Sequence, residues 1–368
     1  MTIMQRRVFI KELIQWLKGA GLVIFLPVFL NPKRVAAGQN TGPGAAAADG
    51  MSLREFVENK RHHRANRFEN PFPGSDHGNP WRVLKWKLFS KNHHKALYRS
   101  ERVKPVTIDW SPVARHAGVS ITFVNHASVM IKDNNTYLLV DPVFDGLFPL
   151  ITDYSPLNFD INTMPSPDHV LITHGHYDHL DKPSLGRLDA NTHVITPLGY
   201  KGIFKGLGMK NQYRLDWFES YREGGREIIL LPCKHWTMRN PLIGPNRSLW
   251  GSYLIKTSVG VNIFISGDTA YHERYAELGR DFSIDLAIFN LGAYEPRWFM
   301  ASSHINPRET VQAFKALGAR QLAVIHWGTF RLGDEPVYLP PIAIKKEMEE
   351  AGLSDRLVQI NHGNTLFF

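Results

Sequence analysis

The sequence has only one cysteine, Cys233, so no disulfide can form within the chain. The fold therefore does not depend on an oxidising compartment. Long apolar runs are also missing, because the run at residues 20–30 covers 11 residues, too few to span a bilayer. No internal repeat and no nucleic-acid-binding motif is present. These absences exclude a disulfide-stapled scaffold and a repeat array, and they predict that nucleic acid is not a partner.

The composition is that of an ordinary globular chain. Its 368 residues are 43% hydrophobic and 21% charged, which is enough to bury a large core. The formal net charge is +9, and residues 1–37 hold six basic side chains against one acidic, so 9 − 5 = +4 remains for the rest. This uneven charge suits an anionic membrane surface. We predict one catalytic domain over residues 51–368, preceded by an N-terminal extension.

The N-terminal extension resembles a twin-arginine export signal. Arg6 and Arg7 precede the apolar run, and stretches of small residues follow it. We predict a signal or membrane-associated segment over residues 1–37 and a flexible Gly/Ala-rich linker over residues 38–50. The expected location is periplasmic or membrane-associated, because this export route carries folded proteins. An uncleaved amphipathic helix and an incidental hydrophobic terminus are the alternatives.

Residues 51–105 form a basic arm with interleaved aromatic side chains. Within it, Trp81, Leu84 and Leu88 fall on one helical face, a pattern that suits a membrane interface. Buried aromatic stripes are commoner than membrane-binding ones, so we expect this face to pack on the catalytic core. The histidines of the arm have no partners at ligand spacing and are predicted to be solvated; they are His62, His63, His93 and His94.

From residue 118 onward, short β-rich runs recur with helical segments between some of them. This pattern favours sheets packed together with helices outside. A helix is well marked over residues 307–317, because Asn306 and Glu309 form a capping box at its start. Gly318 follows its end. Strands are predicted at residues 119–124, 137–140, 169–172, 193–196, 227–231, 261–265, 286–289 and 322–325.

Side chains that bind metals gather directly after the predicted strand at residues 169–172. Residues 174–179 read His-Gly-His-Tyr-Asp-His, and Gly175 permits the tight backbone that such crowding demands. Three further candidates also follow apolar strands, a repeated placement that chance explains poorly. Imidazole and carboxylate ligands suit Zn²⁺, and Mn²⁺ or Fe²⁺ is also compatible. The predicted ligands of a two-metal site are His174, His176, Asp178, His179, His235, Asp268 and His326.

This ligand pattern resembles the metallo-β-lactamase superfamily. The resemblance implies an α/β (α+β) fold, an αββα sandwich with its site at the sheet edges. It also implies that His174, His176 and His235 hold one metal, that Asp178, His179 and His326 hold the other, and that Asp268 bridges the two metals. Asp141 would lie behind the ligands and orient them.

Within this superfamily the chain resembles the phospholipases D that hydrolyse N-acylphosphatidylethanolamine. The resemblance implies a dinuclear zinc phosphodiesterase that releases an N-acylethanolamine and phosphatidic acid, with phospholipid at a membrane surface as its substrate. Where mammalian-type members have a basic residue after a His-Trp pair, this chain has Thr237 and Met238 before Arg239. The resemblance runs from about residue 80 to the end and rests on residues 125–130, 174–181, 234–236, 249–252, 267–269, 292–300 and 325–330.

Two metals would lower the pKa of a shared water to about 7, giving a hydroxide that attacks phosphorus in line. Asp178 and His304 are the predicted catalytic side chains. His304 stands beside the N-terminus of the 307–317 helix, where both could meet a phosphate, although a plain structural histidine is the alternative. Tyr294 and Arg297 are predicted to contact the headgroup or to brace the cavity. Apolar residues for acyl chains are predicted to be Leu147, Phe148, Trp217, Phe218 and Phe299.

Two other functions fit the same residues. A related hydrolase, such as a lactonase or soluble phosphodiesterase, would share the fold and the metals, since neither selects a substrate. A membrane-attached lipid-binding protein without activity would keep the fold, but the complete ligand set speaks against it. The sequence leaves the oligomeric state open, with a homodimer as one option.

Overall fold

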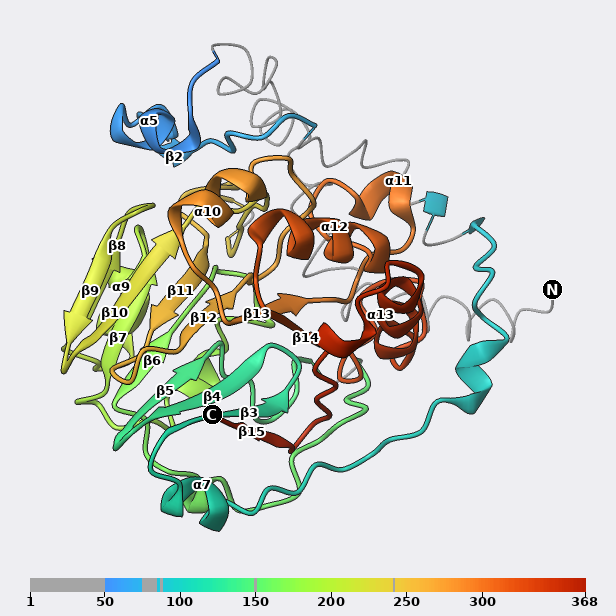
Figure 1. Ribbon diagram of the computed structural model, residues 1–368, viewed down its shortest axis with the longest axis horizontal. Helices are drawn as coiled ribbons and strands as arrows, with labels where there is room; N and C mark the ends of the chain where they lie inside the picture. Colours follow the sequence, from blue (N-terminus) through green and yellow to red (C-terminus); the bar gives the residue numbers. More distant parts are fainter. Residues whose placement is uncertain (1–49, 75–84, 87–88, 149–150, 241) are drawn as a thin grey trace, which may run out of the picture.

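The computed structural model describes residues 50–74, 85–86, 89–148, 151–240 and 242–368. The predicted signal segment, nearly all of the predicted linker and most of the Trp81–Phe89 pattern lie outside the described residues. Within the part of the chain that the structure describes, every helix is too short or too polar to cross a lipid bilayer. Figure 1 shows two sheets stacked face to face, with helices outside them.

The first sheet has seven strands in the order β15-β3-β4-β5-β6-β7-β8. Its strands are antiparallel from β15 to β5 and parallel from β5 to β8. The bounds are β3 Val119–Asn125, β4 Ser128–Asp133, β5 Thr136–Val140, β6 His169–Leu171, β7 His193–Pro197, β8 Gln212–Leu215 and β15 Thr365–Phe367.

The second sheet has six strands in the order β14-β13-β12-β11-β10-β9. It is antiparallel from β9 to β12 and parallel from β12 to β14. The bounds are β9 Ser220–Glu223, β10 Arg226–Leu231, β11 Ser252–Lys256, β12 Asn262–Ile265, β13 Leu286–Asn290 and β14 Gln321–Ile325. A separate two-stranded hairpin pairs β1 (His63–Arg64) with β2 (Arg67–Phe68).

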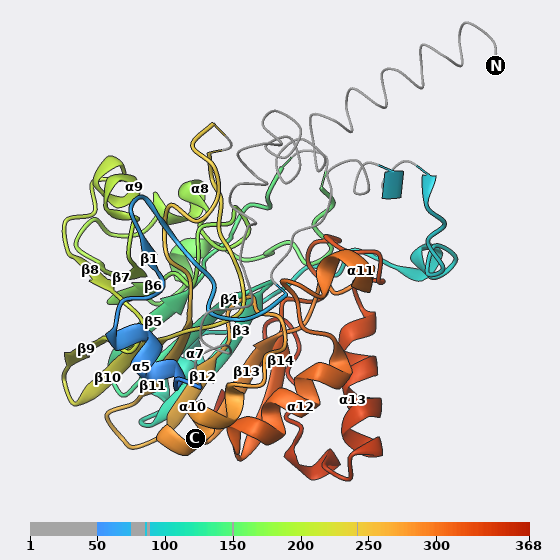
Figure 2. The same ribbon diagram turned by 90° about the horizontal axis from the view of Figure 1, so that it is seen from above.

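Helices cover the outer faces of both sheets. In Figure 2, α10 (Tyr275–Asp281), α12 (Pro307–Leu317) and α13 (Leu339–Glu350) lie along the second sheet. On the first sheet, Leu185 and Phe204 pack against outward-facing side chains of β6 and β7. The other helices given for the described residues are α5 Leu53–Glu58, η1 Leu97–Ser100, α7 Ser111–Arg115, η2 Ile161–Thr163, α8 Lys182–Leu185, α9 Lys201–Gly206, α11 Arg297–Met300 and η3 Ser354–Arg356. The predicted αββα sandwich is confirmed.

The main core lies between the sheets because the strands alternate inward and outward side chains. Leu171 and Ile195 of the first sheet face the second sheet, while Val170 and Val194 pack under the helices. Tyr253 of β11 crosses the interface, since its hydroxyl donates to the backbone oxygens of residues 172 and 195. Burial of these apolar faces fixes the register of both sheets.

The predicted strands and the predicted helix are confirmed. Helix α12 begins after Asn306, which forms the capping box with Glu309, and it ends at Gly318, whose φ is +64°. This left-handed geometry suits glycine because it has no side chain. Its buried face includes Val311 and Phe314, as the periodicity indicates.

The N-terminal arm packs onto the core in its described part, where Leu53, Phe56 and Phe72 are buried. The prediction that the arm histidines are solvated is wrong for His62, which is fully buried and lies 2.7 Å from Asp216. Its ring stacks on Trp217 with centroids 4.7 Å apart. This contact was hidden because Asp216 lies 154 residues away along the chain.

Candidate metal centre

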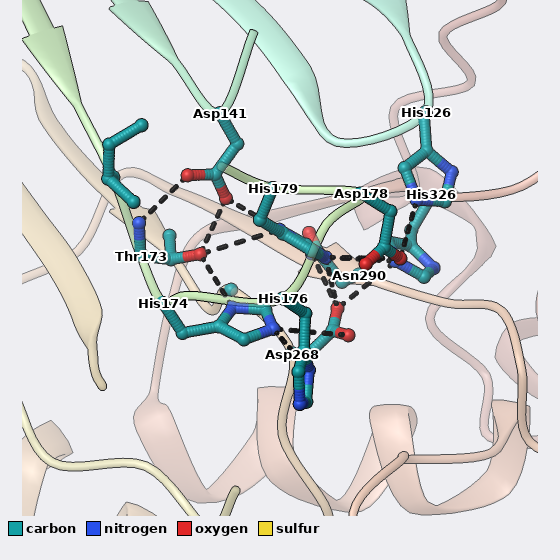
Figure 3. A network of polar contacts seen from close by, with 12 residues as sticks. His126, Asp141, Thr173, His174, His176, Asp178, His179, Asp268, Asn290 and His326 are labelled. Carbon is teal, nitrogen blue, oxygen red and sulfur yellow. Dashed lines mark hydrogen bonds and ion pairs between the residues drawn. The ribbon is translucent and has the colours of Figure 1, made fainter. Parts of the chain in front are cut away.

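The seven predicted ligands lie together where strands of both sheets end at one edge of the sandwich. Figure 3 labels all of them except His235. The structure groups them into two neighbouring clusters, because parallel and alternate strands bring their carboxyl ends to the same edge. One cluster contains His174, His176, His235 and Asp268, and the other contains His126, Asp178, His179 and His326.

In the first cluster, three imidazole nitrogens converge. His176 Nδ1 lies 2.9 Å from His174 Nε2 and 3.2 Å from His235 Nε2. Oδ2 of Asp268 lies 3.9 Å from each of those two Nε2 atoms. Three nitrogens and one carboxylate oxygen match the ligand types and number of a zinc site.

In the second cluster, the other oxygen of Asp268 is the shared atom. Oδ1 lies 3.3 Å from His179 Nε2 and 3.2 Å from His326 Nε2. Oδ2 of Asp178 lies 3.7 Å from each of the same two nitrogens. Because its two oxygens face different clusters, Asp268 lies where a bridging carboxylate between two cations would lie.

The electrostatics of the two clusters fit a bound cation. Burial lowers the pKa of His176 to about 4 and the pKa of His174 well below its usual range, so these imidazoles are neutral at neutral pH. Burial raises the pKa of Asp178, but His179 and hydrogen bonds to His126 and His326 outweigh it and lower that pKa well below normal. Neutral imidazole and ionised carboxylate are the forms that bind metals.

Groups behind the clusters set the orientation of the ligands. Asp141 accepts hydrogen bonds from the backbone N–H and hydroxyl of Thr173, at 2.8 Å and 2.5 Å. It also lies 2.7 Å from His179 Nδ1, which turns His179 Nε2 toward Asp268. His235 is held in the same way, because its Nδ1 lies 2.9 Å from the backbone oxygen of Ser303. Such partners fix the tautomer and ring orientation of a ligating histidine.

Glycine is required inside the ligand loop. A Cβ atom at Gly175 would lie 2.7 Å from Thr237 Oγ1 and 2.9 Å from the ring of Tyr200. The backbone N–H of Gly175 donates to the same Thr237 hydroxyl. Thr237 and Tyr200 pack directly against the backbone of Gly175, and this leaves no room for a side chain at that position.

His126 is a member of the second cluster that the sequence reasoning missed. Its Nε2 lies 3.1 Å from Asp178 Oδ2, and its ring lies 4.0 Å from that of His326. Its backbone N–H donates to Thr329 Oγ1, and its carbonyl accepts from the backbone N–H of His326. The missed signal was its position directly after β3, the same strand-end placement that identified the other ligands.

We expect His126→Ala to lower the metal affinity of the second cluster by about 10- to 100-fold, because Asp178 loses the group that holds it. Metal content after dialysis against graded chelator measures the effect. His116→Ala is the matched control, since His116 lies against the C-terminal strand and touches neither cluster. Equal metal retention in both variants would contradict this role.

Arg239 is a second residue whose part the sequence did not reveal. Its guanidinium donates to the backbone oxygens of Gly175 and Leu180, at 3.1 Å and 2.7 Å. It also lies over the ring of Tyr177, 4.3 Å from the centroid. Arg239 therefore clamps the ligand loop from behind, and it is not the exposed basic group of a headgroup site.

Of the remaining predicted site residues, one lies at the metal-ligand clusters and two do not line the cavity. His304 lies at the site, with Nδ1 3.8 Å from Asp268 Oδ2. Arg297 instead braces the fold, because it pairs with Glu309 at 2.8 Å and donates to the backbone oxygen of His304. Tyr294 is buried and is not among the residues that line the cavity.

The prediction that the N-terminus of α12 meets a phosphate stays a prediction, and the capping box leaves few backbone donors for it. The backbone N–H groups of Asn306 and Glu309 are taken by the capping box, at 3.0 Å and 2.8 Å. Pro307 has no N–H to offer. The Glu309 carboxylate also places negative charge at the helix start, which leaves the side chain of His304 to meet an anion.

An open cavity of about 930 Å³, including space continuous with solvent, lies over the two clusters. Its floor contains His176, Asp178, Asp268 and His304. Trp217 and Phe218, predicted to contact acyl chains, do not line it, because Trp217 is buried in the core and Phe218 packs against that core. The remaining wall residues are Leu147, Phe148, Ile151, Tyr177, Trp236, Met238, Ala293, Phe299, Met300, Ser302, Ser303 and Leu332.

Two adjacent clusters of imidazole and carboxylate side chains lie beneath an open cavity. This arrangement supports hydrolysis assisted by metal ions. The chain is a metallo-hydrolase of the β-lactamase fold. The sequence profile of the Beta-lactamase superfamily domain matches residues 136–327, just over half of the chain, so the chain belongs to this family. The resemblance found in the sequence is confirmed.

Comparison with known proteins shows which members of the family this chain is similar to. The chain is 32% identical over 256 residues to "N-acyl-phosphatidylethanolamine-hydrolyzing phospholipase D 1" of Caenorhabditis elegans, covering 64% of this chain and 71% of the relative. It is 31% identical over 249 residues to the mitochondrial protein of the same activity in Saccharomyces cerevisiae, covering 64% of this chain and 53% of the relative. An isothiocyanate hydrolase from Delia radicum gut bacteria shares the fold, with a TM-score of 0.57 at 16% identity over 68% of this chain and 99% of that one.

Proposed function

We propose that this protein is a dinuclear zinc phosphodiesterase that hydrolyses N-acylphosphatidylethanolamine to an N-acylethanolamine and phosphatidic acid. The observation that carries the proposal is that the two metal-ligand clusters lie at the bottom of an apolar cavity. His176, Asp178 and Asp268 form the floor of this cavity. The similarity to two proteins named for this reaction supports the choice of substrate.

The walls of the cavity fit a lipid better than a small polar ester. They include Leu147, Phe148, Ile151, Phe299 and Met300. Apolar side chains favour acyl chains because burial removes hydrocarbon from water. A phosphodiester held over the floor would thus have its acyl chains along the walls.

Two bound divalent cations would supply the charge that activates a water molecule and stabilises negative charge on the phosphate. The ligand residues and the residues behind them would determine where the two cations lie. Asp268 faces both clusters and holds them at one spacing, and Asp141 keeps His179 directed at it. Asp178 remains ionised at neutral pH because His179 and its hydrogen bonds to His126 and His326 lower its pKa despite burial.

His304 is proposed to contact the phosphate. Burial lowers the pKa of His304 to about 4, and bound cations would lower it further, so the neutral ring can donate one N–H but carries no proton to give up at neutral pH. We expect His304→Gln to lower kcat by about 10²-fold, as loss of one donor to a developing oxyanion does, while the metal content is unchanged. Steady-state kinetics with metal analysis measures both quantities. Ser302→Ala, at the same wall, serves as control and is expected to stay within a few-fold of the parent.

The substrate is tested by product identification. Metal-loaded protein is incubated with vesicles of a defined N-acylphosphatidylethanolamine and, separately, with a soluble aryl phosphodiester, and the products are identified by mass spectrometry. The expected products from the lipid are N-acylethanolamine and phosphatidic acid. Turnover of the soluble ester alone would overturn the lipid assignment and favour a soluble phosphodiesterase, and turnover of neither would favour a binding protein.

We further propose that the protein acts at a membrane surface after export by the twin-arginine route. The supporting residues are Arg6 and Arg7 ahead of the apolar run at residues 20–30, together with the basic excess of residues 1–37. Replacing both arginines with lysine should leave the folded enzyme in the cytoplasm when cells are fractionated. An unchanged periplasmic fraction would remove this proposal but not the proposed reaction.

A further inference from the structure

A second group of metal-ligand side chains lies at the opposite end of the sandwich from the candidate metal centre. His169 begins β6, and the ligand loop follows the far end of the same strand. His174 follows His169 by five steps along the chain, which span roughly 16 Å when extended. The two sites are therefore independent, and none of the residues below touches either catalytic cluster.

Two parallel strands bring the imidazoles of this group together. His169 and His193 are register partners in β6 and β7, and their ring centroids lie 5.3 Å apart. They share the inner face of the first sheet with Leu171 and Ile195, which belong to the core between the sheets. Both rings therefore point toward the second sheet.

The second sheet supplies a carboxylate opposite these rings. Glu223 ends β9, and its Oε2 lies 2.7 Å from His169 Nε2 while its Oε1 lies 3.8 Å from His193 Nδ1. Tyr221, on the same face of β9, places its hydroxyl 3.1 Å from His193 Nδ1 and 3.4 Å from His169 Nε2. Three strands from two sheets thus aim polar atoms at one point.

We infer that His169, His193 and Glu223 form a Zn²⁺ site that joins the edges of the two sheets, with Tyr221 beside the ion and water completing the coordination. Two imidazoles and one carboxylate are a zinc ligand set, whereas Mg²⁺ and Ca²⁺ prefer oxygen ligands. The three ligand atoms lie within 4.8 Å of one another. A tetrahedral ion with bonds of about 2.0 to 2.1 Å needs ligand atoms about 3.3 Å apart, so the ligand atoms need to approach one another by no more than about 1.5 Å.

The surroundings favour an ion here. Glu223 is 42% exposed and His193 is 29% exposed, so an ion can enter from solvent and the carboxylate can move. The nearby Arg226 is already paired with Asp133 at 3.0 Å, and among the described ion pairs Glu223 faces only the two imidazoles.

A third histidine cluster in the described part of the chain serves as a comparison. His62 and His63 both contact Asp216, but Lys60 Nζ lies 2.6 Å from the same carboxylate. The lysine already supplies the positive charge, so an ion there would have to displace it. His63→Ala is therefore a matched control that removes a histidine from a His/His/carboxylate cluster without removing a zinc ligand.

Zinc stoichiometry tests the inference. Full-length protein is saturated with Zn²⁺, passed through gel filtration in buffer with Zn²⁺ held at a fixed micromolar level, and analysed by mass spectrometry. The parent and His63→Ala should each bind one more equivalent than His193→Ala and Glu223→Gln, and all four should keep the same kcat. Equal stoichiometry in all four proteins would overturn the site.

Two further measurements locate the ion independently of activity. Anomalous diffraction at the zinc edge should show a peak between His169 and Glu223 in parent crystals and none there in Glu223→Gln crystals. Added Zn²⁺ should also raise the Tm of the parent more than that of His193→Ala, since an ion that links two sheets stabilises the folded state. A peak elsewhere, or an equal rise in Tm, would contradict the assignment.

Discussion

Asp268→Asn is expected to lower kcat/KM by on the order of 10³-fold, because a single side chain that serves both clusters loses its charge. Oδ1 of Asp268 lies near His179 and His326, and Oδ2 lies near His174 and His235. An amide has one carbonyl oxygen and cannot serve two cations. Metal content should fall from two equivalents at the centre to one or fewer, as measured by mass spectrometry.

A matched control separates this effect from a loss of stability. Asp133 is also a fully buried carboxylate, but it pairs with Arg226 far from the clusters. Asp133→Asn should lower the Tm, since it leaves a buried charge unpaired, while keeping the metals and most of kcat. An Asp268→Asn protein that retains both metals and full activity would remove Asp268 from the bridging position.

Removal of the metals is expected to give the second large effect. Two ions, each present at about 1,000 times its Kd, together stabilise the folded state by about 8 kcal/mol, so chelation should lower the Tm by about 10 °C in a chain of 368 residues. The physical reason is that removal of the cations leaves the carboxylates of Asp268, Asp178 and Asp141 with protonation of His179 as their compensation, since these carboxylates raise the pKa of His179 well above normal despite burial. Differential scanning calorimetry with and without chelator measures the change.

Restoring single metals identifies the ion. Zn²⁺ added back to the chelated protein should recover both the Tm and the activity, and the recovery with Mn²⁺ or Fe²⁺ ranks the alternatives. The Asp268→Asn variant is the control, because its Tm should respond much less to chelator. A chelated parent with unchanged Tm and unchanged turnover would exclude a metal requirement.

Much of the fold could be predicted because it is encoded locally. Short β-rich runs mark β3, β5, β6, β7, β10, β12, β13 and β14, and the capping box at Asn306 marks the start of α12. Strands β1, β2, β4, β8, β9, β11 and β15 were not predicted. Two of them, β8 and β9, have exposed and mixed faces that give no clear period, and β15 has only three residues.

Most of the metal ligands of the candidate site could also be predicted from local sequence, but His126 and the residues of the cavity walls could not. A ligand that directly follows an apolar strand can be recognised in the sequence, and this placement gave seven of the eight histidines and aspartates in the two clusters. His126 follows β3 in the same way, yet it was passed over because one histidine after one strand is a weak signal. The wall residues of the cavity carried no such signal, and Trp217 was wrongly placed there for its aromatic character.

The amino-acid sequence by itself determined which side chains lie at the strand ends, because apolar strand patterns and helix caps depend only on residues close together in the sequence. Only the tertiary structure decided which of those ends meet. Arg239 reaches the carbonyl of Gly175 across 64 residues, and His62 reaches Asp216 across 154. Such contacts follow from the order of strands in the two sheets, and that order is set by the packing of whole faces, which local patterns of hydrophobicity do not contain.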